Sequence, residues 1–264
     1  MVRHRGSFKP EHTEAYELSR SKVEAFIRCP ACFWLDRAKG IKFPSIPGFL
    51  LNSNTDKLLK KEFDQYRGKG PHPIMAANGL GHLTPFDHSD MKLWENALSF
   101  GKDDHHFNSL HEETNIRFGG GLDDVWQDTN TGVLHIVDYK STSNQRAIPE
   151  PVTLEGKWKA GYKRQMDMYQ WIMRRKGFDV SDIGYFLYVD GLHADYGGMI
   201  DLTDTKKAVM HFSTSILPYA GSDNWVEDAL MAIKQLLLSD TAPNHSEECE
   251  FGIFLNLVSL INPD

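Results

Sequence analysis

The chain has 264 residues, of which 41% are hydrophobic and 25% charged, as is usual for a globular protein with a substantial core. A formal net charge of -7 excludes a strongly basic polyanion binder, so any contact with nucleic acid needs local basic patches. The N-terminus MVRHRGSFKPEHTE lacks a long apolar segment, and no run is long enough to cross a membrane. The three cysteines do not suggest a disulfide framework, and we expect a cytoplasmic protein without membrane contact.

The first part of the chain has helical spacing. The segment ELSRSKVEAFIRCPACFWLDRAKG offers Ser19 or Ser21 as a helix cap, followed by apolar residues at helical intervals. Pro30 interrupts this pattern because proline has no amide hydrogen to donate. We therefore expect the stretch CPAC to lie at a kink or between two short helices.

Two more helices are predicted before the periodicity changes. The first covers residues 54–67, with Leu58, Leu59 and Phe63 facing inward. A loop rich in glycine and proline follows, and the second helix is expected near SDMKLWENALSF.

An alternating pattern then predicts strands. The segments NIRFGGGLDDVWQD, TNTG and VLHIVDYKST are typical of a β-hairpin with its turn. A helix over roughly residues 159–176, closed by Gly177, leads to the strand IGYFLYVDG, with GGMIDL as its antiparallel neighbour. A long amphipathic helix starts at Ser222, and the tail APNHSEECEFGIFLNLVSLI is apolar and less regular.

This order of elements predicts an α/β fold with a mixed central β-sheet flanked by helices and preceded by an N-terminal helical segment. Residues 1–17 are interpreted as a flexible arm, and residues 18–264 as one domain. Within that domain we expect a mainly helical part at 18–108, a core at 109–205, and a C-terminal helix and tail at 206–264.

The hairpin carries the candidate chemistry. Asp138 and Lys140 end an apolar run and face the same side of a strand, and Asp123 stands on the other arm. Two carboxylates on adjacent strand ends can hold Mg²⁺ or Mn²⁺, and a nearby lysine can orient water or neutralise developing charge. The alternative is that Asp123 and Asp124 are surface acids beside a turn and Lys140 is an exposed lysine.

A polar pair follows on the next helix. Gln165 and Tyr169 are four residues apart and share one face, from which they could contact DNA or Lys140. The alternative is a satisfied core tyrosine beside a surface glutamine.

These motifs, in this order, resemble the PD-(D/E)XK nuclease superfamily and, more specifically, its RecB-like branch. LSRSKVEAFIRCPACFWLDR resembles the opening helix of that branch, and GGGLDDVW resembles its Gly-x-x-Asp motif, which nominates Asp123. IVDYKST resembles the strand with the acid-x-Lys motif, which nominates Asp138 and Lys140. QMDMYQWI resembles the helix motif that nominates Gln165 and Tyr169.

The resemblance spans about residues 18–175 and implies a restriction-endonuclease-like core. It further implies a metal-dependent DNA nuclease that hydrolyses phosphodiester bonds, exonuclease-like, in DNA repair, recombination, or phage and mobile-element defence. DNA is the partner that it implies, with a helicase or another protein as a further one.

One ligand position departs from the family pattern. RecB-like members usually carry a histidine or glutamate in an early helix as a further metal ligand, and the corresponding segment LLNSNTDKLLKKEFDQYR has no histidine. Asp56 aligns with that position, and Glu62 is the alternative. A plain surface acid is the competing interpretation for each of the two.

The cysteines allow two interpretations. Many relatives in this branch bind an iron–sulfur cluster through four cysteines, whereas this chain has Cys29, Cys32 and Cys249, and Gly252 stands where a second Cys-x-x-Cys would need its last cysteine. His245 could complete a Cys₃His site for Zn²⁺. Otherwise this is a degenerate iron–sulfur site whose cysteines are buried small hydrophobic residues.

Basic and aromatic residues lie next to the proposed site. The basic ones could follow a phosphate backbone; they are Lys157, Lys159, Lys163 and Arg164. Trp158 and Tyr162 could stack on the bases of a single strand, or could anchor a solvated face. A rival function is a catalytically impaired, nuclease-fold DNA-binding or assembly subunit, and a third possibility is an unrelated α/β domain.

Overall fold

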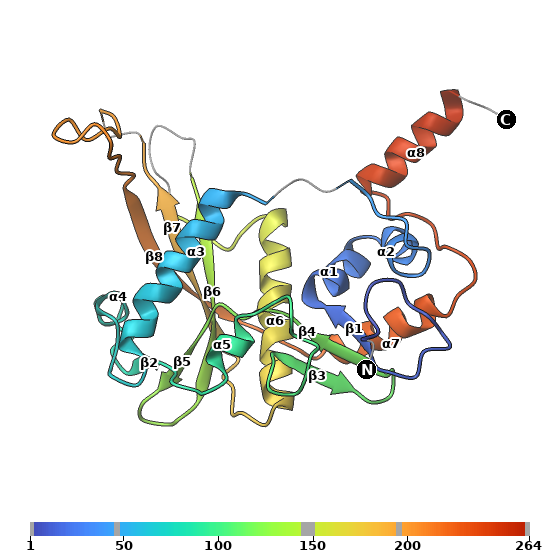
Figure 1. Cartoon of the computed structure of the whole chain (residues 1–264), viewed down its shortest axis with the longest axis horizontal. Helices are drawn as coiled ribbons and strands as arrows, with labels where there is room; N and C mark the ends of the chain where they lie inside the picture. Colours follow the sequence, from blue (N-terminus) through green and yellow to red (C-terminus); the bar gives the residue numbers. More distant parts are fainter. Residues whose placement is uncertain (1–2, 45–47, 144–150, 194–196, 262–264) are drawn as a thin grey trace. The chain divides into compact units, whose positions relative to one another are not determined.

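The chain forms two compact units, each built from separate stretches of sequence. The computed structural model describes residues 3–44, 48–143, 151–193 and 197–261 (Figure 1). Unit 1 comprises Met1–Ile46, Lys92–Gly121 and Ser222–Asp264, and unit 2 comprises Pro47–Met91 and Leu122–Gly221. The single domain expected for residues 18–264 stays a prediction, whereas His4 and Phe8 of the expected flexible arm, residues 1–17, are buried within unit 1.

Unit 2 is built on a five-stranded sheet in the order β2-β5-β6-β7-β8. Its strands are β2 (Leu83–Pro85), β5 (Asp124–Asp128), β6 (Leu134–Thr142), β7 (Ile183–Gly191) and β8 (Phe212–Ala220). The β6–β7 pair is parallel and the other pairs are antiparallel, so the sheet is mixed. The predicted hairpin is confirmed for β5 and β6, in which alternating residues face opposite sides. The start of its expected first arm is instead β4 (Ile116–Gly119), which belongs to the sheet of unit 1.

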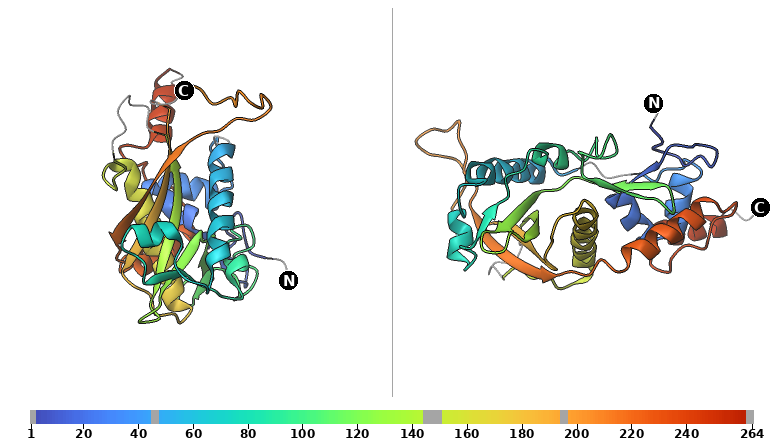
Figure 2. Two further views of the ribbon diagram at one scale, coloured as in Figure 1. Left: turned by 90° about the vertical axis from the view of Figure 1, so that its left-hand side faces the viewer. Right: turned by 90° about the horizontal axis from the view of Figure 1, so that it is seen from below.

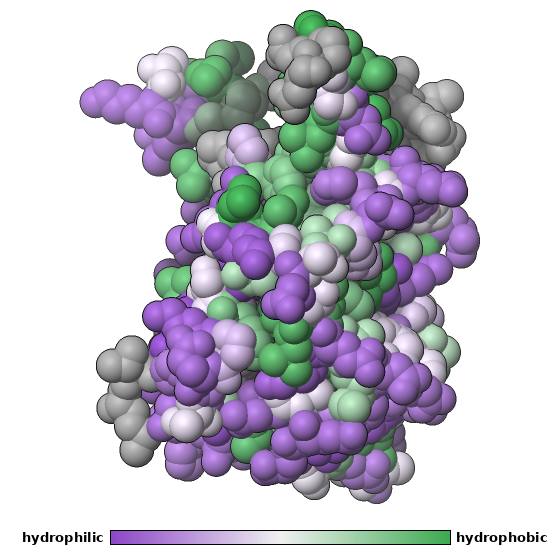
Figure 3. All heavy atoms as spheres, turned by 90° about the vertical axis from the view of Figure 1, so that its right-hand side faces the viewer, coloured by the Kyte–Doolittle hydropathy of each residue, from purple (hydrophilic) through white to green (hydrophobic). Residues whose placement is uncertain are grey.

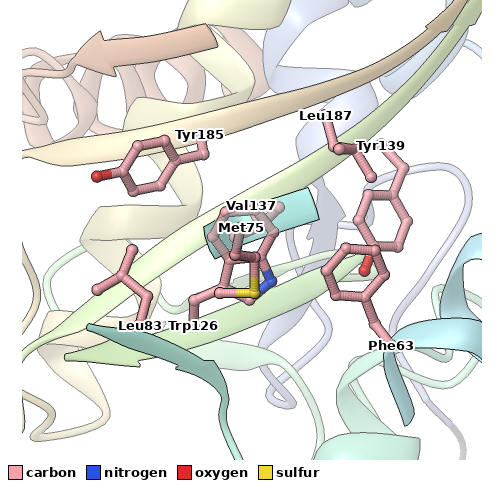
Figure 4. Close-up of a cluster of buried hydrophobic side chains, with 8 residues drawn as sticks. All are labelled: Phe63, Met75, Leu83, Trp126, Val137, Tyr139, Tyr185 and Leu187. Carbon is pink, nitrogen blue, oxygen red and sulfur yellow. The ribbon is translucent and has the colours of Figure 1, made fainter. Parts of the chain in front are cut away.

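Two helices lie on opposite faces of this sheet, α3 (Leu50–Phe63) and α6 (Ala160–Arg175) (Figure 2). On the α3 side, Phe63 packs with Val137 and Tyr139 of β6 in an apolar cluster that also contains Trp126 and Leu187 (Figure 4). The remaining helices of unit 2 are short: η1 (Asp64–Tyr66), α4 (Pro73–Ala77) and η2 (Lys157–Lys159).

On the other face, α6 lies close to the sheet because β7 carries a glycine beneath it. A Cβ atom at Gly184 would stand 2.3 Å from the sulfur of Met166, so a side chain there would push the helix away. The predicted end of this helix is confirmed, since Gly177 follows it with a φ of 89° that favours glycine.

Unit 1 combines a small mixed sheet with helices. The sheet has the order β1-β4-β3, in which β1 (Tyr16–Ser19) and β4 (Ile116–Gly119) are parallel and β3 (Asn108–His111) is antiparallel to β4. Its helices are α1 (Arg20–Arg28), α2 (Pro30–Arg37), α7 (Val226–Leu237) and α8 (Glu250–Ile261). Pro30 separates α1 from α2 as predicted, because proline is tolerated at the first position of a helix but not inside it. The mixed sheets and flanking helices confirm the α/β class.

The expected strand partner of β7 is wrong. The segment GGMIDL forms only an isolated bridge between Ile200 and Ala208, and the antiparallel neighbour of β7 is β8. All nine residues of β7 pair with β8, from Ile183–Ala220 to Gly191–Phe212, so the longer strand satisfies the whole edge of β7.

The early helices also differ from the prediction in their bounds. In α3, Thr55 and Phe63 are buried, whereas Leu58 is 64% exposed and does not face inward. Leu58 lies about 100° around the helix from Leu59, which packs against the core. The helix expected near SDMKLWENALSF is only α5 (Met91–Trp94), after which the chain turns.

The C-terminal part contains one more helix than predicted. The helix expected from Ser222 begins at Val226, and the tail expected to be irregular forms α8. Most apolar side chains of α8 are exposed, Leu260 by 76%, and hydrophobic residues gather at the top of the face seen in Figure 3. Among the helices formed by the described residues, none is both long enough and apolar enough to traverse a lipid bilayer.

Candidate functional site

The hairpin of unit 2 places two predicted site residues on one face of β6. Asp138 and Lys140 point toward α6. Val137, which precedes Asp138, and Tyr139, which lies between the two, enter the apolar cluster on the other face of the sheet. Only 1% of the Asp138 side chain and 14% of the Lys140 side chain are exposed, and the Lys140 ammonium lies against Asp138 Oδ2. The pair is therefore not a solvated edge of the sheet.

Asp123 lies across the hairpin from Asp138. It immediately precedes β5, whose first residue pairs with Val137, and its Oδ2 accepts a hydrogen bond of 3.0 Å from the backbone N–H of Tyr139. This bond holds the Asp123 carboxylate beside β6. The side chain of Asp123 is 19% exposed.

Helix α6 supplies the group that orients Asp138. The Gln165 side-chain amide donates a hydrogen bond of 2.6 Å to Asp138 Oδ1. The other oxygen of this carboxylate, Oδ2, is the one that the ammonium of Lys140 contacts. Tyr169, the other residue nominated on this helix, is 3% exposed and one turn further along.

Of the two early acids, the structure brings Asp56 to the hairpin. Both Asp56 and Asp123 contact Lys60 of α3, with Lys60 Nζ at 3.2 Å from Asp56 Oδ2 and 3.0 Å from Asp123 Oδ1. Glu62 points elsewhere, since its carboxylate lies 3.1 Å from His72 Nε2.

Burial and neighbouring charges separate the hairpin acids. Burial, which outweighs the ammonium of Lys140, raises the pKa of Asp138 to about 7, and the Asp123 carboxylate acts in the same direction. Burial also opposes ionisation of Asp123, but Lys60 and Lys140 outweigh it and lower the pKa of Asp123. Burial and then the Asp123 charge raise the pKa of Asp56. Near neutral pH the site can therefore hold a proton on Asp138 while Asp123 is ionised.

Two aromatic side chains extend the site from Lys140 toward η2. The Lys140 ammonium lies 4.7 Å from the ring centroid of Tyr162. Lys159 donates a hydrogen bond of 2.9 Å to the hydroxyl of Tyr188, which is paired with Lys140 across β6 and β7. Burial, followed by repulsion from Lys140, lowers the pKa of Lys159. Trp158, beside Lys159, is 85% exposed.

Asp124 has a different environment from Asp123. It is fully buried, and it accepts hydrogen bonds from Arg67 at 2.7 Å and from the Tyr139 hydroxyl at 2.6 Å. The indole N–H of Trp126 donates a third bond, of 3.1 Å. Asp124 therefore links the hairpin to Arg67, which follows η1. It is not the surface acid of the alternative interpretation.

The sequence does not single out Lys159, and Lys60 is absent from the expected site residues. Lys60 could have been found from its place four residues after Asp56, which puts both on one helix face. Lys159 was named only as one of several basic residues, and nothing in its local sequence distinguishes it from Lys157 or Lys163.

A second cluster lies in unit 1, where the predicted sulfur and imidazole ligands come together. The ligand atoms of Cys29, Cys32, His245 and Cys249 all lie within 4.8 Å of one another. His245 Nδ1 is 3.4 Å from the sulfur of Cys29 and 3.5 Å from those of Cys32 and Cys249. Among the described residues, no other group of three or more His, Cys, Asp or Glu ligands is gathered in this way, and this one could hold a metal such as zinc.

The thiols of this cluster differ in acidity. Burial would raise the pKa of Cys29, but hydrogen bonds from the backbone of Cys32 and Ser246 and from the side chains of His245 and Cys249 lower it to about 6. Burial raises the pKa of Cys32, and the two neighbouring thiols raise it further. A cation among the sulfurs would relieve this repulsion.

Comparison with family models, with curated proteins and with solved structures finds no match for this chain. The chemistry that the two clusters can perform therefore follows from their own side chains.

Proposed function

We propose that the chain is a metal-dependent nuclease that hydrolyses DNA phosphodiesters, and that unit 2 has a restriction-endonuclease-like core. The observation that carries this proposal is the convergence of Asp123, Asp138 and Lys140 at one end of the hairpin, with Gln165 bound to Asp138. Two buried acids whose pKa values are shifted in opposite directions, next to a lysine, support a catalytic role for this site.

Asp123, Asp138 and Asp56 would hold Mg²⁺ or Mn²⁺. Their oxygen ligands suit these hard cations. The ammonium of Lys140 lies against Oδ2 of Asp138, so an ion that uses this oxygen has to displace it. When bound, such an ion polarises a phosphoryl oxygen and lowers the pKa of a bound water.

The surrounding side chains have separate roles. Gln165 fixes the rotamer of the Asp138 carboxylate through its bond to Oδ1. Lys140 orients the attacking water and neutralises charge on the phosphoryl oxygens, and Tyr162 confines its ammonium by the contact on the ring face. Tyr169 is buried, so its role is support of α6 rather than contact with the DNA strand.

The basic residues near η2 favour a nucleic acid as the substrate. Lys157, Lys159, Lys163 and Arg164 could follow the phosphates, and the exposed indole of Trp158 could stack on a base. The exonuclease preference, a role in repair, recombination or defence, and a helicase or another protein as partner rest on the resemblance of the motifs.

A DNA-binding or assembly subunit without catalysis is the second candidate. Lys60 favours it, because its ammonium already lies between Asp56 and Asp123, where it compensates two of the three proposed metal ligands. A permanent internal counter-ion would leave a nuclease-like surface that binds DNA but does not cleave it.

The deciding experiment is a cleavage assay on labelled single-stranded DNA, double-stranded DNA and RNA, with Mg²⁺, Mn²⁺ or a chelator. We expect cleavage of DNA that needs the metal and falls by at least ~100-fold in Lys140→Ala, in line with the loss of one electrostatic group. Lys206→Ala is the matched control, because Asp204 and Lys206 repeat the acid-x-Lys spacing outside the site. Wild-type protein that binds DNA without cleaving it under any condition would establish the second candidate instead.

A further inference from the structure

We propose that unit 1 binds a single Zn²⁺ ion, held tetrahedrally by the sulfurs of Cys29, Cys32 and Cys249 and by His245 Nδ1, in place of an iron–sulfur cluster. The site lies outside the candidate nuclease centre, and the inference does not rest on the proposed function. It would join the start of α2 to the start of α8, which are far apart in the sequence.

The ligand spacing matches one ion. Zinc–sulfur bonds of ~2.3 Å and zinc–nitrogen bonds of ~2.0–2.1 Å at tetrahedral angles give sulfur–nitrogen edges of ~3.5–3.6 Å. The nitrogen of His245 lies 3.4, 3.5 and 3.5 Å from the three sulfurs. The sulfurs of Cys32 and Cys249 are 3.3 Å apart, somewhat closer than the ~3.8 Å edge between two zinc-bound thiolates.

The same spacing does not fit an iron–sulfur cluster. Such a cluster places several irons and sulfides between its protein ligands, which then stand farther apart than the edges of a tetrahedron around one ion. The whole chain has three cysteines, so four thiolates cannot come from one molecule. A Cys₃His set is, by contrast, a frequent structural zinc site.

Gly252 explains why the fourth ligand is a histidine. A Cβ atom at Gly252 would lie 2.5 Å from Cβ and 2.7 Å from Cγ of His245, so the imidazole occupies the space that a side chain at position 252 would need. The backbone N–H of Gly252 also lies 3.4 Å from the sulfur of Cys249, as a donor to it. The glycine therefore admits the imidazole and supports a neighbouring thiolate at once.

Two helix N-termini meet the thiolates. Cys29 caps α2, and its carbonyl accepts the first helical bond from Phe33 N–H at 3.1 Å. Cys249 has the same place before α8, where its carbonyl accepts from Ile253 N–H at 2.9 Å. A zinc ion with three thiolates and one neutral imidazole has a net charge of -1, which the positive ends of two helices favour.

The test is metal analysis of the whole protein, purified without added metal and dialysed against a weak chelator. We expect one zinc per chain, and no iron or acid-labile sulfide. Replacement by Co²⁺ should give the visible absorption of a tetrahedral thiolate site, a readout that does not depend on nuclease activity. Protein that is free of metal and does not take up Zn²⁺ or Co²⁺, or that contains iron with sulfide, would overturn the proposal.

Variants identify the ligands. His245→Ala and Cys249→Ser should lose the zinc, whereas His245→Cys should retain it with a spectrum shifted toward four sulfurs. Lys140→Ala should keep its zinc whatever happens to DNA cleavage, which separates this inference from the proposed nuclease. If the first two variants fail to fold, the zinc content of the wild type and of His245→Cys still tests the proposal. Retention of zinc by a folded His245→Ala would contradict the proposed ligand set.

Discussion

The ammonium of Lys60 lies 3.0 Å from Asp123 Oδ1 and so places a positive charge at the acidic end of the hairpin. The carboxylates of Asp123 and Asp56 raise the pKa of Lys60 against the effect of burial, so this charge is permanent at physiological pH. A divalent ion that binds these acids has to compete with it.

Replacing Lys60 should reveal that competition. We expect Lys60→Met to lower the free energy of unfolding by about 1–3 kcal/mol without divalent ions, because two carboxylates lose their counter-ion. Added Mg²⁺ or Mn²⁺ should then raise the melting temperature of the variant more than that of the wild type. Calorimetric melting with and without the ions measures both effects, with the exposed neighbour Lys61→Met as control. Equal metal responses in all three proteins would contradict a competition between Lys60 and the ion.

Replacement of the adjacent acids Asp123 and Asp124 by asparagine should have different effects on stability and on cleavage. Asp124→Asn breaks the ion pair between fully buried Asp124 and the largely buried Arg67, and should lower the free energy of unfolding by about 3 kcal/mol. Asp123→Asn should abolish cleavage at a much smaller loss of stability, because its carboxylate is partly exposed. Urea unfolding of the two variants makes the comparison, and an Asp124→Asn protein as stable as the wild type would refute the anchoring role.

The raised pKa of Asp138 predicts a pH dependence of stability. An acid whose pKa is about 7 in the folded state and ~4 when unfolded resists ionisation in the fold, so its contribution is most favourable below pH ~4 and declines as the pH rises to about 7. The asparagine of Asp138→Asn cannot ionise. The free energy of unfolding of this variant, relative to that of the wild type, should therefore increase as the pH rises from ~4 to about 7. The lowered pKa of Asp123 acts only below pH ~4, outside this window.

Unfolding curves of Asp138→Asn and wild type are taken in chelator across this pH range. They test how the difference in their free energies of unfolding changes with pH, rather than the absolute stability of either protein. The control is Asp204→Asn, whose carboxylate pairs with exposed Lys207. A stability difference that stays constant with pH would show that Asp138 titrates like an ordinary carboxyl.

Gly252 offers a test of the zinc site that leaves all four ligands in place. Gly252→Ala puts a methyl group against the imidazole of His245 and should weaken zinc binding by about 10–100-fold, as the loss of supporting contacts does at other metal sites. Competition with a chromophoric chelator measures the affinity. Gly48→Ala is the control, because a Cβ there meets nothing within 4 Å. Unchanged affinity in Gly252→Ala would mean that His245 does not need this position empty.

Trp158 should contribute to binding of single strands if the proposed function holds. Trp158→Ala should weaken binding of a labelled single-stranded oligonucleotide by about tenfold, which lies within the ~1–3 kcal/mol that one stacked base contributes. Fluorescence anisotropy in chelator measures binding without cleavage, and Trp158→Phe should retain most of the affinity because it keeps a stacking face. Full affinity of Trp158→Ala would remove the indole from the proposed substrate surface.

Local sequence was sufficient for the hairpin and for the pairing of its acids. Apolar alternation defines β6, and a short turn forces β5 to run beside it, so Asp123 and Asp138 have to meet. The helix bounds around Pro30 and Gly177 were predictable for the same reason, since both residues act on their own backbone.

Elements that depend on distant partners were not predictable in this way. β8 has a half-exposed, mixed pattern that includes Pro218, and it is recognisable as a strand only from its pairing with β7. The tail looked irregular because its apolar residues do not form a single stripe, although they form the helix α8. The choice between Asp56 and Glu62 likewise needed the packing of α3 on the sheet.

The order of segments in unit 1 has a consequence for synthesis of the protein. Strand β1 pairs with β4, which is translated between the two stretches of unit 2. Helix α1 contacts α7, so it waits for a partner that is translated after the whole of unit 2. At ~5–20 residues per second, the ~200 residues between α1 and α7 take ~10–40 s to translate. Unit 2 can complete its sheet on the ribosome first, while Cys29 and Cys32 emerge early and stay accessible to oxidants and chaperones until His245 and Cys249 arrive.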